Sequence, residues 1–146
     1  SVIIGLLVIV AFQVISGSNN IGDKIFLEEE AGFLLRKTDW IISGASSINS
    51  PTYGNYSTTT LSVDKFGFSA SENPVVFSVE NGQLLIKRGS GSQTALNSAF
   101  ITVQNATFTQ IAATGTTPAG IKAEFSIKNT ATPETRQYSL TTYLRP

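Results

Sequence analysis

The stretch Ser1-Val-Ile-Ile-Gly-Leu-Leu-Val-Ile-Val-Ala-Phe-Gln-Val-Ile15 decides how the remainder of the chain is interpreted, because it is almost wholly apolar. A soluble monomer that exposed this stretch would present a large apolar patch to water, and such patches usually mark a partner or a membrane. The stretch is therefore expected to insert in a bilayer, to be removed as a signal peptide, or to pack against the same segment of other copies.

The length of the apolar segment, residues 2–15, bears on these alternatives. Spanning a bilayer takes roughly 20 apolar residues, and this segment supplies 14. The chain also contains no Met, so we expect the natural chain to begin upstream of Ser1 and to extend the apolar run. The predicted membrane or filament-core interface consists of Val2, Ile3, Ile4, Leu6, Leu7, Val8, Ile9, Val10, Phe12, Val14 and Ile15.

The composition excludes several classes of function. Ten Lys and Arg residues balance ten Asp and Glu residues, which removes the electrostatic basis for general nucleic-acid binding. His and Cys are both absent, so the usual general base and the strongest common nucleophile are missing. The carboxylates beyond residue 50 are scattered, whereas a calcium site needs them clustered. We therefore predict no enzyme, no cofactor, no metal site and no nucleic-acid partner.

Residues 23–48 are predicted to form an amphipathic helix. Their apolar positions recur at steps of three and four residues, as on one helical face: Leu27, Ala31, Leu34, Leu35, Thr38, Ile41, Ile42 and Ala45. The acidic run Glu28-Glu29-Glu30 is interpreted as a solvated or inter-subunit face, because successive helical residues point about 100° apart. Trp40 is expected to pack between helix and sheet rather than to bind a ligand.

Glycines mark the expected weak points of this helical region. Gly5, Gly17 and Gly22 lower helix propensity by up to about 1 kcal/mol each, so a helix break is predicted at one of them. A helix continuing from residue 1 to residue 48 would be a rod of roughly 70 Å. About half of such a rod would protrude from a head of the remaining residues.

The chain beyond residue 50 is predicted to be an antiparallel sheet. Phe77 and Val79 alternate with polar residues, Asn81-Gly82 suits a tight hairpin turn, and Leu84 and Ile86 follow. This register sets Val79 opposite Leu84 and Phe77 opposite Ile86. Similar alternation predicts further strands around residues 61–63, 101–108, 121–127 and 138–140. The predicted domains are therefore a helical stem, 1–50, and a β head, 51–146.

Together these features resemble the type IV pilin superfamily, in its minor-pilin or pseudopilin form. The resemblance rests on Ser1-Val-Ile-Ile-Gly-Leu-Leu-Val8, on Leu27-Glu-Glu-Glu-Ala-Gly-Phe-Leu-Leu-Arg-Lys-Thr-Asp-Trp40, and on the ending Tyr138-Ser-Leu-Thr-Thr-Tyr-Leu-Arg-Pro146. It implies the pilin fold, an α+β architecture in which a long protruding N-terminal helix packs by its lower half on a small antiparallel β-sheet head.

Two features depart from that family's pattern. The family keeps a glutamate near its mature amino terminus, whereas position 5 is Gly5 and the first carboxylate is Asp23. The glutamate is therefore upstream of Ser1, or the chain is a divergent member such as an archaeal-type pilin. Many major pilins also close a loop with a disulfide, which a chain without Cys cannot form.

The function implied by the resemblance is that of a structural subunit of a type IV pilus-like filament on the cell surface, and the complete apolar segment favours the major pilin. Its expected partners are copies of itself, the cytoplasmic membrane before assembly, and the pilus assembly machinery. The alternative is a membrane-tethered adhesive or ligand-binding module, with the polar loops 52–60 and 114–119 as its binding surface.

Overall fold

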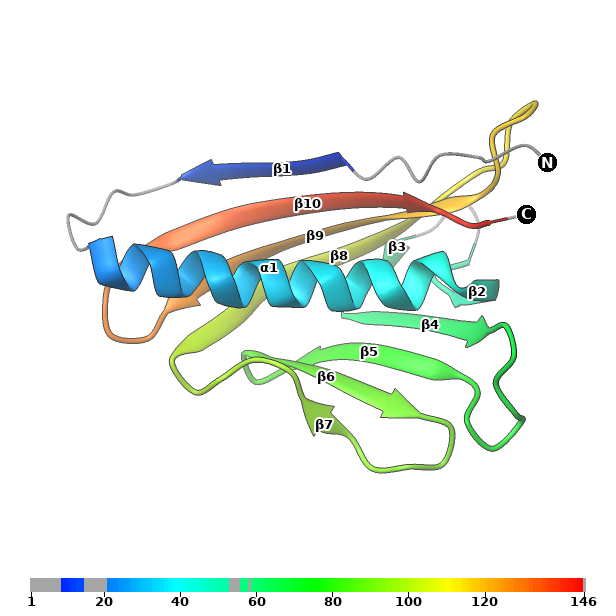
Figure 1. Cartoon of the computed structure of the whole chain (residues 1–146), viewed down its shortest axis with the longest axis horizontal. Coiled ribbons are helices and arrows are strands. Elements are labelled where there is room, and N and C mark those ends of the chain that lie inside the picture. The colour runs from blue at the N-terminus through cyan, green and yellow to red at the C-terminus, as the bar shows by residue number, and fades with distance from the viewer. Residues whose placement is uncertain (1–8, 15–20, 53–55, 58, 146) are drawn as a thin grey trace.

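The computed structural model describes residues 9–14, 21–52, 56–57 and 59–145. It contains the helix α1 (Ile21–Ser43) and ten strands (Figure 1). The strands are β1 (Ile9–Val14), β2 (Ala45–Ser50), β3 (Tyr56–Ser57), β4 (Thr60–Lys65), β5 (Val75–Glu80), β6 (Gln83–Arg88), β7 (Thr94–Ala95), β8 (Ile101–Ile111), β9 (Gly120–Asn129) and β10 (Thr135–Tyr143).

The strands form two antiparallel sheets of five strands each. Sheet A has the order β1-β10-β9-β8-β3, and sheet B has the order β2-β4-β5-β6-β7. Figure 1 shows α1 along the longest axis of the molecule, with β1 and β10 on one side of it and β4–β7 on the other, while β8 and β9 pass behind it. The helix contacts β9 and β10 of sheet A and β4 of sheet B, while β8 contacts β4, β5 and β6.

A single hydrophobic core joins the helix to both sheets. The helix contributes one buried face: Leu27, Ala31, Leu34, Leu35, Ile41 and Ile42. Sheet B contributes Leu61, Val63, Val75, Phe77 and Leu84, and sheet A contributes its largest part from β8, β9 and β10. The predicted apolar face of the helix is therefore confirmed from Leu27 to Ile42.

The predicted hairpin is also confirmed. Phe77 pairs with Ile86 and Val79 pairs with Leu84. Asn81 and Gly82 have φ angles of 51° and 78°, the positive values that a two-residue turn of this kind requires. The C-terminal strands follow the predicted alternation, because Ile101, Phe108, Ile121, Ile127 and Leu140 are all buried within β8, β9 and β10.

The predicted pilin fold is wrong for this structure. The molecule is mostly β, and its 23-residue helix spans about 35 Å rather than roughly 70 Å. Residues buried in the core extend along α1 from Leu27 to Ile42, so half of the helix does not protrude. The sheet is not small either, because β8 brings a second sheet against the first and the two share one core.

The predicted helix is too long at its C-terminal end. It ends at Ser43, and the residues from Ala45 onward form β2, which begins its pairing with β4 at Ala45 and Lys65. The buried Ala45 continues the three- and four-residue spacing of the helix, so the sequence pattern alone conceals the change. A Cβ at Gly44 would lie 2.6 Å from Lys65 Nζ, so a larger residue at this turn would require the lysine side chain to shift.

The apolar start of the chain was predicted to be helical, whereas residues 9–14 form β1. This strand is the outermost strand of sheet A and pairs antiparallel with β10, from Ile9 opposite Thr141 to Val14 opposite Arg136. An uninterrupted apolar run is compatible with either a buried strand or a buried helix. Within the described residues, no helix combines the length and the apolar character that crossing a bilayer requires.

A glycine at the end of sheet B gives a first testable prediction. Gly89 has a φ of 50°, and a Cβ there would lie 1.9 Å from the backbone oxygen of Ser71. Gly115 has a φ of 53° with no atom within 4 Å of that position. We expect Gly89→Ala to lower the free energy of unfolding by about 2 to 4 kcal/mol, and Gly115→Ala by about 1 kcal/mol. Equal losses in urea unfolding of the two variants would contradict the clash.

Candidate functional site

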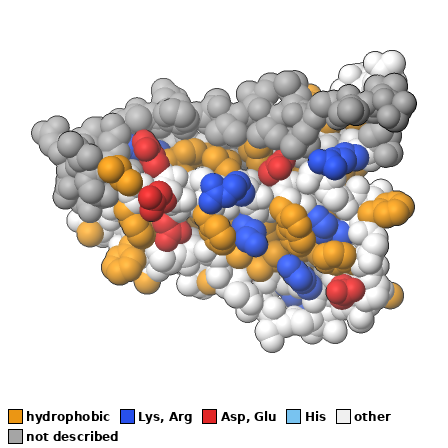
Figure 2. All heavy atoms as spheres, in the orientation of Figure 1, with side chains coloured by type: hydrophobic (Ala, Val, Ile, Leu, Met, Phe, Trp, Pro, Cys, Tyr) orange, Lys and Arg blue, Asp and Glu red, His pale blue; other side chains and the backbone are white. Residues whose placement is uncertain are grey.

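Three cations and three aromatic rings gather where the second half of α1 meets one end of sheet B. This set, the Trp40 cluster, consists of Phe33, Lys37, Trp40, Lys65, Phe68 and Arg88. In Figure 2 basic and apolar side chains alternate over this part of the surface, whereas acidic side chains gather near the start of the helix.

Secondary structure explains why these distant residues meet. Phe33, Lys37 and Trp40 are four and three residues apart, which places them on one face of α1. Lys65 and Arg88 are the last residues of β4 and β6. Both strands run antiparallel to β5, which lies between them, so both end at the same side of sheet B. Phe68 follows β4 in the loop to β5.

The indole ring of Trp40 is the centre of the cluster. Lys65 Nζ lies 3.9 Å from its centroid, Arg88 Cζ 5.3 Å and Lys37 Nζ 5.9 Å. All three distances are within the range of about 6 Å in which a ring face attracts a cation. The Phe68 ring lies 6.3 Å from the Trp40 ring and 5.8 Å from Arg88 Cζ. Three positive charges thus lie within about 6 Å of one tryptophan ring.

Lys65 is the buried member of the cluster. Its residue is only 6% exposed, and its Nζ donates a hydrogen bond to the backbone oxygen of Trp40, near the C-terminus of α1, where the helix dipole favours a cation. Burial lowers the pKa of Lys65 below 10.5, the charge of Arg88 lowers it further, and Asp39 partly offsets both. Among the described residues no carboxylate forms an ion pair with Lys65.

The lowered pKa predicts a pH-dependent stability. Between the pKa of Lys65 in the folded chain and 10.5, the unfolded chain binds more protons, so raising the pH through this window stabilises the folded state. We therefore expect the free energy of unfolding of the wild type to rise relative to that of Lys65→Met as the pH approaches 10.5.

Chemical denaturation at several pH values measures this difference. Because both proteins carry the same other titratable groups, their comparison removes the contribution of those groups to the pH dependence. One such group is Tyr138, whose pKa is raised by burial, an effect that Arg136 partly offsets. The exposed Lys128 provides the matched variant Lys128→Met, for which we expect no such trend. If the difference in free energy of unfolding between the wild type and Lys65→Met stays constant over this pH window, the lowered pKa of Lys65 is contradicted.

A second charged group lies at the other end of the helix and is largely buried. Arg136 of β10 is fully buried and contacts Glu134, which is 1% exposed, through Nε at 3.2 Å and Nη2 at 2.9 Å. Its Nη1 lies 2.6 Å from Oε1 of Glu28 on α1. The second oxygen of Glu134 and the hydroxyl of Tyr138 have no hydrogen-bond partner among the described residues. This group ties α1 to β10, with Arg136 and Glu134 buried and the side chain of Glu28 53% exposed.

The predicted interface residues are only partly within the described chain. Ile9, Val10, Phe12 and Val14 lie in β1. Val2, Ile3, Ile4, Leu6, Leu7, Val8 and Ile15 lie outside the described residues, as do Gly5 and Gly17. Gly22, the third predicted break position, is the second residue of α1.

The polar loops of the alternative function are also only partly described. In the loop at 52–60, residues 53–55 and 58 lie outside the described residues, and residues 56–57 form β3. The loop at 114–119 is an exposed turn closed by two hydrogen bonds between the backbones of Thr114 and Thr117. The sequence does not predict the positions of Lys65, Phe68 and Arg88, because only the fold brings them to Trp40. The spacing of Phe33, Lys37 and Trp40 was the one available signal.

Within the described residues, no group of three or more acidic side chains is placed to hold a metal ion. A scan against protein-family models and searches of curated proteins and of solved structures found no match to this chain.

Proposed function

We propose that this chain is a structural subunit of a type IV pilus-like filament on the cell surface. Before assembly, the apolar segment, residues 2–15, holds the subunit in the cytoplasmic membrane; after assembly by the pilus machinery, the same segment packs against its neighbours in the filament core. The observation that carries the proposal is this segment and the position of its described part, β1, at the outer edge of sheet A.

The edge position of β1 supports self-association. Its sequence, Ile-Val-Ala-Phe-Gln-Val, is apolar at five of six positions. Its inner edge pairs with β10, and no described strand pairs with its outer edge. An apolar edge strand with free backbone N–H and C=O groups is a template for association with another chain. A second copy can therefore add to this edge or replace the pairing with β10.

The core of the molecule supports a division of roles between the segment and the remainder of the chain. The buried hydrophobic residues that the structure describes extend from Leu27 to Leu140 and form one continuous cluster. At about 25 cal/mol per Å², removing a dozen apolar side chains of the segment from water contributes on the order of 15 to 30 kcal/mol relative to full exposure. We therefore propose that the segment acts in assembly. No catalytic role is proposed for the chain.

Electron microscopy of cells that produce the full chain tests this function. We expect surface filaments, and mass spectrometry of sheared and purified filaments should find this chain as their main component. A matched strain should produce the chain without residues 1–15 and form no filaments. Purified filaments that lack this chain, or cells that produce the full chain and remain without filaments, would contradict the proposal.

A second candidate function is favoured by the Trp40 cluster. A membrane-tethered binding module would use the three cations around Trp40 to bind an anionic ligand, because Lys37, Lys65 and Arg88 form no ion pair with any described carboxylate. The two functions differ in their products. A binding module stays a monomer in the membrane and loses ligand affinity in Lys37→Gln or Arg88→Gln, whereas a filament subunit polymerises with either residue changed.

A further inference from the structure

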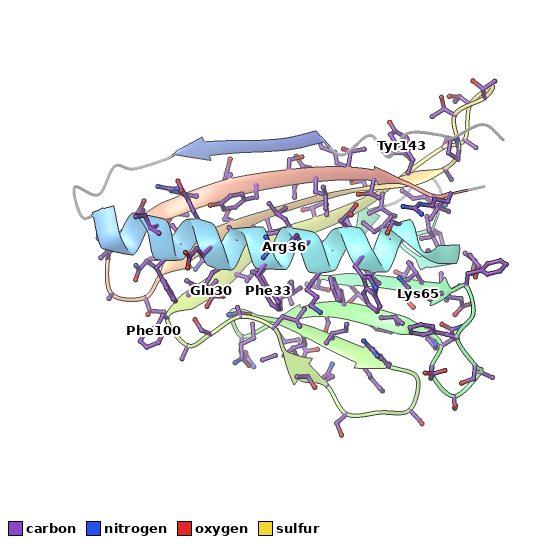
Figure 3. All side chains as sticks on the ribbon, in the orientation of Figure 1. Glu30, Phe33, Arg36, Lys65, Phe100 and Tyr143 are labelled. Carbon is purple, nitrogen blue, oxygen red and sulfur yellow. The ribbon has the colours of Figure 1, made fainter. Side chains whose placement is uncertain are left out.

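The exposed face of α1 carries an ordered series of side chains. Positions 26, 29, 30, 33, 36, 37 and 40 lie within about 120° of one another around the helix, at 100° per residue. This stripe, the α1 stripe, reads Phe26, Glu29, Glu30, Phe33, Arg36, Lys37 and Trp40. Figure 3 labels three of its members, Glu30, Phe33 and Arg36, along the helix. Acidic residues precede Phe33 and basic residues follow it.

The stripe is available on the molecular surface. Glu29 and Arg36 are exposed, and the other five residues are half-buried. None of its four charged residues belongs to an ion pair among the described residues. Glu29 and Arg36 are separated by about 10 Å along the helix, as are Glu30 and Lys37, so these charges cannot neutralise one another within one copy.

The order of the stripe is self-complementary about its central residue. When a second copy is placed antiparallel on the first, with the two Phe33 residues together, Glu29 of each copy meets Lys37 of the other. Glu30 likewise meets Arg36, and Phe26 meets Trp40. Four pairs of opposite charges and two Phe26–Trp40 pairs form around one two-fold axis, with the Phe33 pair on the axis. Such an isologous contact makes the same pairings twice, which is the usual basis of a closed dimer.

We propose that two copies of this chain form a two-fold dimer through antiparallel pairing of their α1 stripes, centred on Phe33. Neighbouring groups extend the contact at both ends. The Phe26 ring packs edge-on against Phe100 at 5.9 Å, and Phe100 is 65% exposed, so both rings can contact Trp40 of the partner. Lys65 and Arg88, next to Trp40, add positive charge on the side that Glu29 of the partner approaches.

The dimer is a separate association from the filament and uses a different surface of the chain. Successive subunits of a polar filament point in one direction, whereas a two-fold axis reverses direction. The dimer would therefore join subunits of two antiparallel filaments, or two subunits before assembly. Leu7→Asp, which is expected to prevent filament formation, leaves the α1 stripe unchanged and should leave the dimer intact, so failure of one proposal is distinguishable from failure of the other.

Charge reversal with complementary variants tests the dimer. Glu29→Lys/Glu30→Lys and Arg36→Glu/Lys37→Glu each set like charges opposite one another in a homodimer, whereas a mixture restores opposite charges at every pairing. Sedimentation of the full chain in mild nonionic detergent at low salt should show a wild-type dimer. We expect the dissociation constant of each variant alone to rise on the order of 100-fold and that of the mixture to return to near the wild-type value. Lys128→Glu, a charge reversal on β9, should dimerise normally.

Cysteine cross-linking tests the two-fold geometry, because the chain contains no Cys of its own. Phe33→Cys lies on the proposed axis and should form a disulfide-linked dimer under mild oxidation, since facing helices can bring such Cα atoms within about 7 Å. Glu29→Cys should cross-link to Lys37→Cys in a mixture, but not to itself. A monomeric wild type, full dimerisation of either charge variant alone, or faster linkage of Glu29→Cys to itself than to Lys37→Cys would overturn the proposal.

Discussion

Replacement of Arg136 by Met is expected to lower the free energy of unfolding by about 3 to 5 kcal/mol, because it leaves a buried carboxylate without its cation. Arg136 and Glu134 are at most 1% exposed and are joined by two hydrogen bonds of 3.2 and 2.9 Å. Arg136 also contacts Glu28 across the gap between β10 and α1. Urea unfolding followed by circular dichroism measures the loss.

Two further variants separate the buried charge from the lost packing. Arg136→Met/Glu134→Leu removes both buried charges and should recover most of the stability, because a well-packed apolar pair often equals a buried ion pair. Lys122→Met breaks the exposed pair with Glu124, whose side chains are 43% and 45% exposed, and should cost less than about 1 kcal/mol. A double variant as unstable as Arg136→Met would show that the loss comes from packing rather than from the unpaired carboxylate.

Leu7→Asp is expected to abolish filament formation. A carboxylate at the centre of the apolar segment would cost roughly 2.5 to 3.5 kcal/mol in a bilayer and would be unpaired in a dry filament core. Leu7→Ala shortens the same side chain without a charge and should still permit filaments. Electron microscopy and the yield of sheared filaments measure both outcomes.

The body of the molecule provides the control for this variant. Its core extends from Leu27 to Leu140, so near-ultraviolet circular dichroism of Leu7→Asp should match that of the wild type. Normal filaments from Leu7→Asp would contradict the role of the segment in assembly. A loss of the near-ultraviolet signal would show that the segment also supports the folded body.

Local patterns in the sequence predicted local structure well. The turn at Asn81 and Gly82 determines the register of its hairpin, because only a few residue types adopt positive φ easily. The three- and four-residue spacing from Leu27 to Ile42 identified the buried face of α1, because it matches the helical period. In both cases the information lies within a few residues of the chain.

The incorrect predictions concern features that depend on distant contacts. Ala45 continues the helical spacing, but it is the first residue of β2, which pairs with β4. The apolar residues 9–14 fit a strand or a helix equally, and their pairing with β10 involves residues more than 100 positions away. The Trp40 cluster required the ends of β4 and β6 to meet α1. The packing of two sheets around one helix therefore depends on contacts that local sequence patterns do not contain.

Helical reconstruction of the purified filament at side-chain resolution tests the proposed function most directly. We expect residues 2–15 of each subunit to pack against the same residues of neighbouring subunits at the centre of the filament, away from water. A filament whose subunits are joined only through their β sheets, with residues 2–15 exposed to solvent, would contradict the proposed role of the apolar segment.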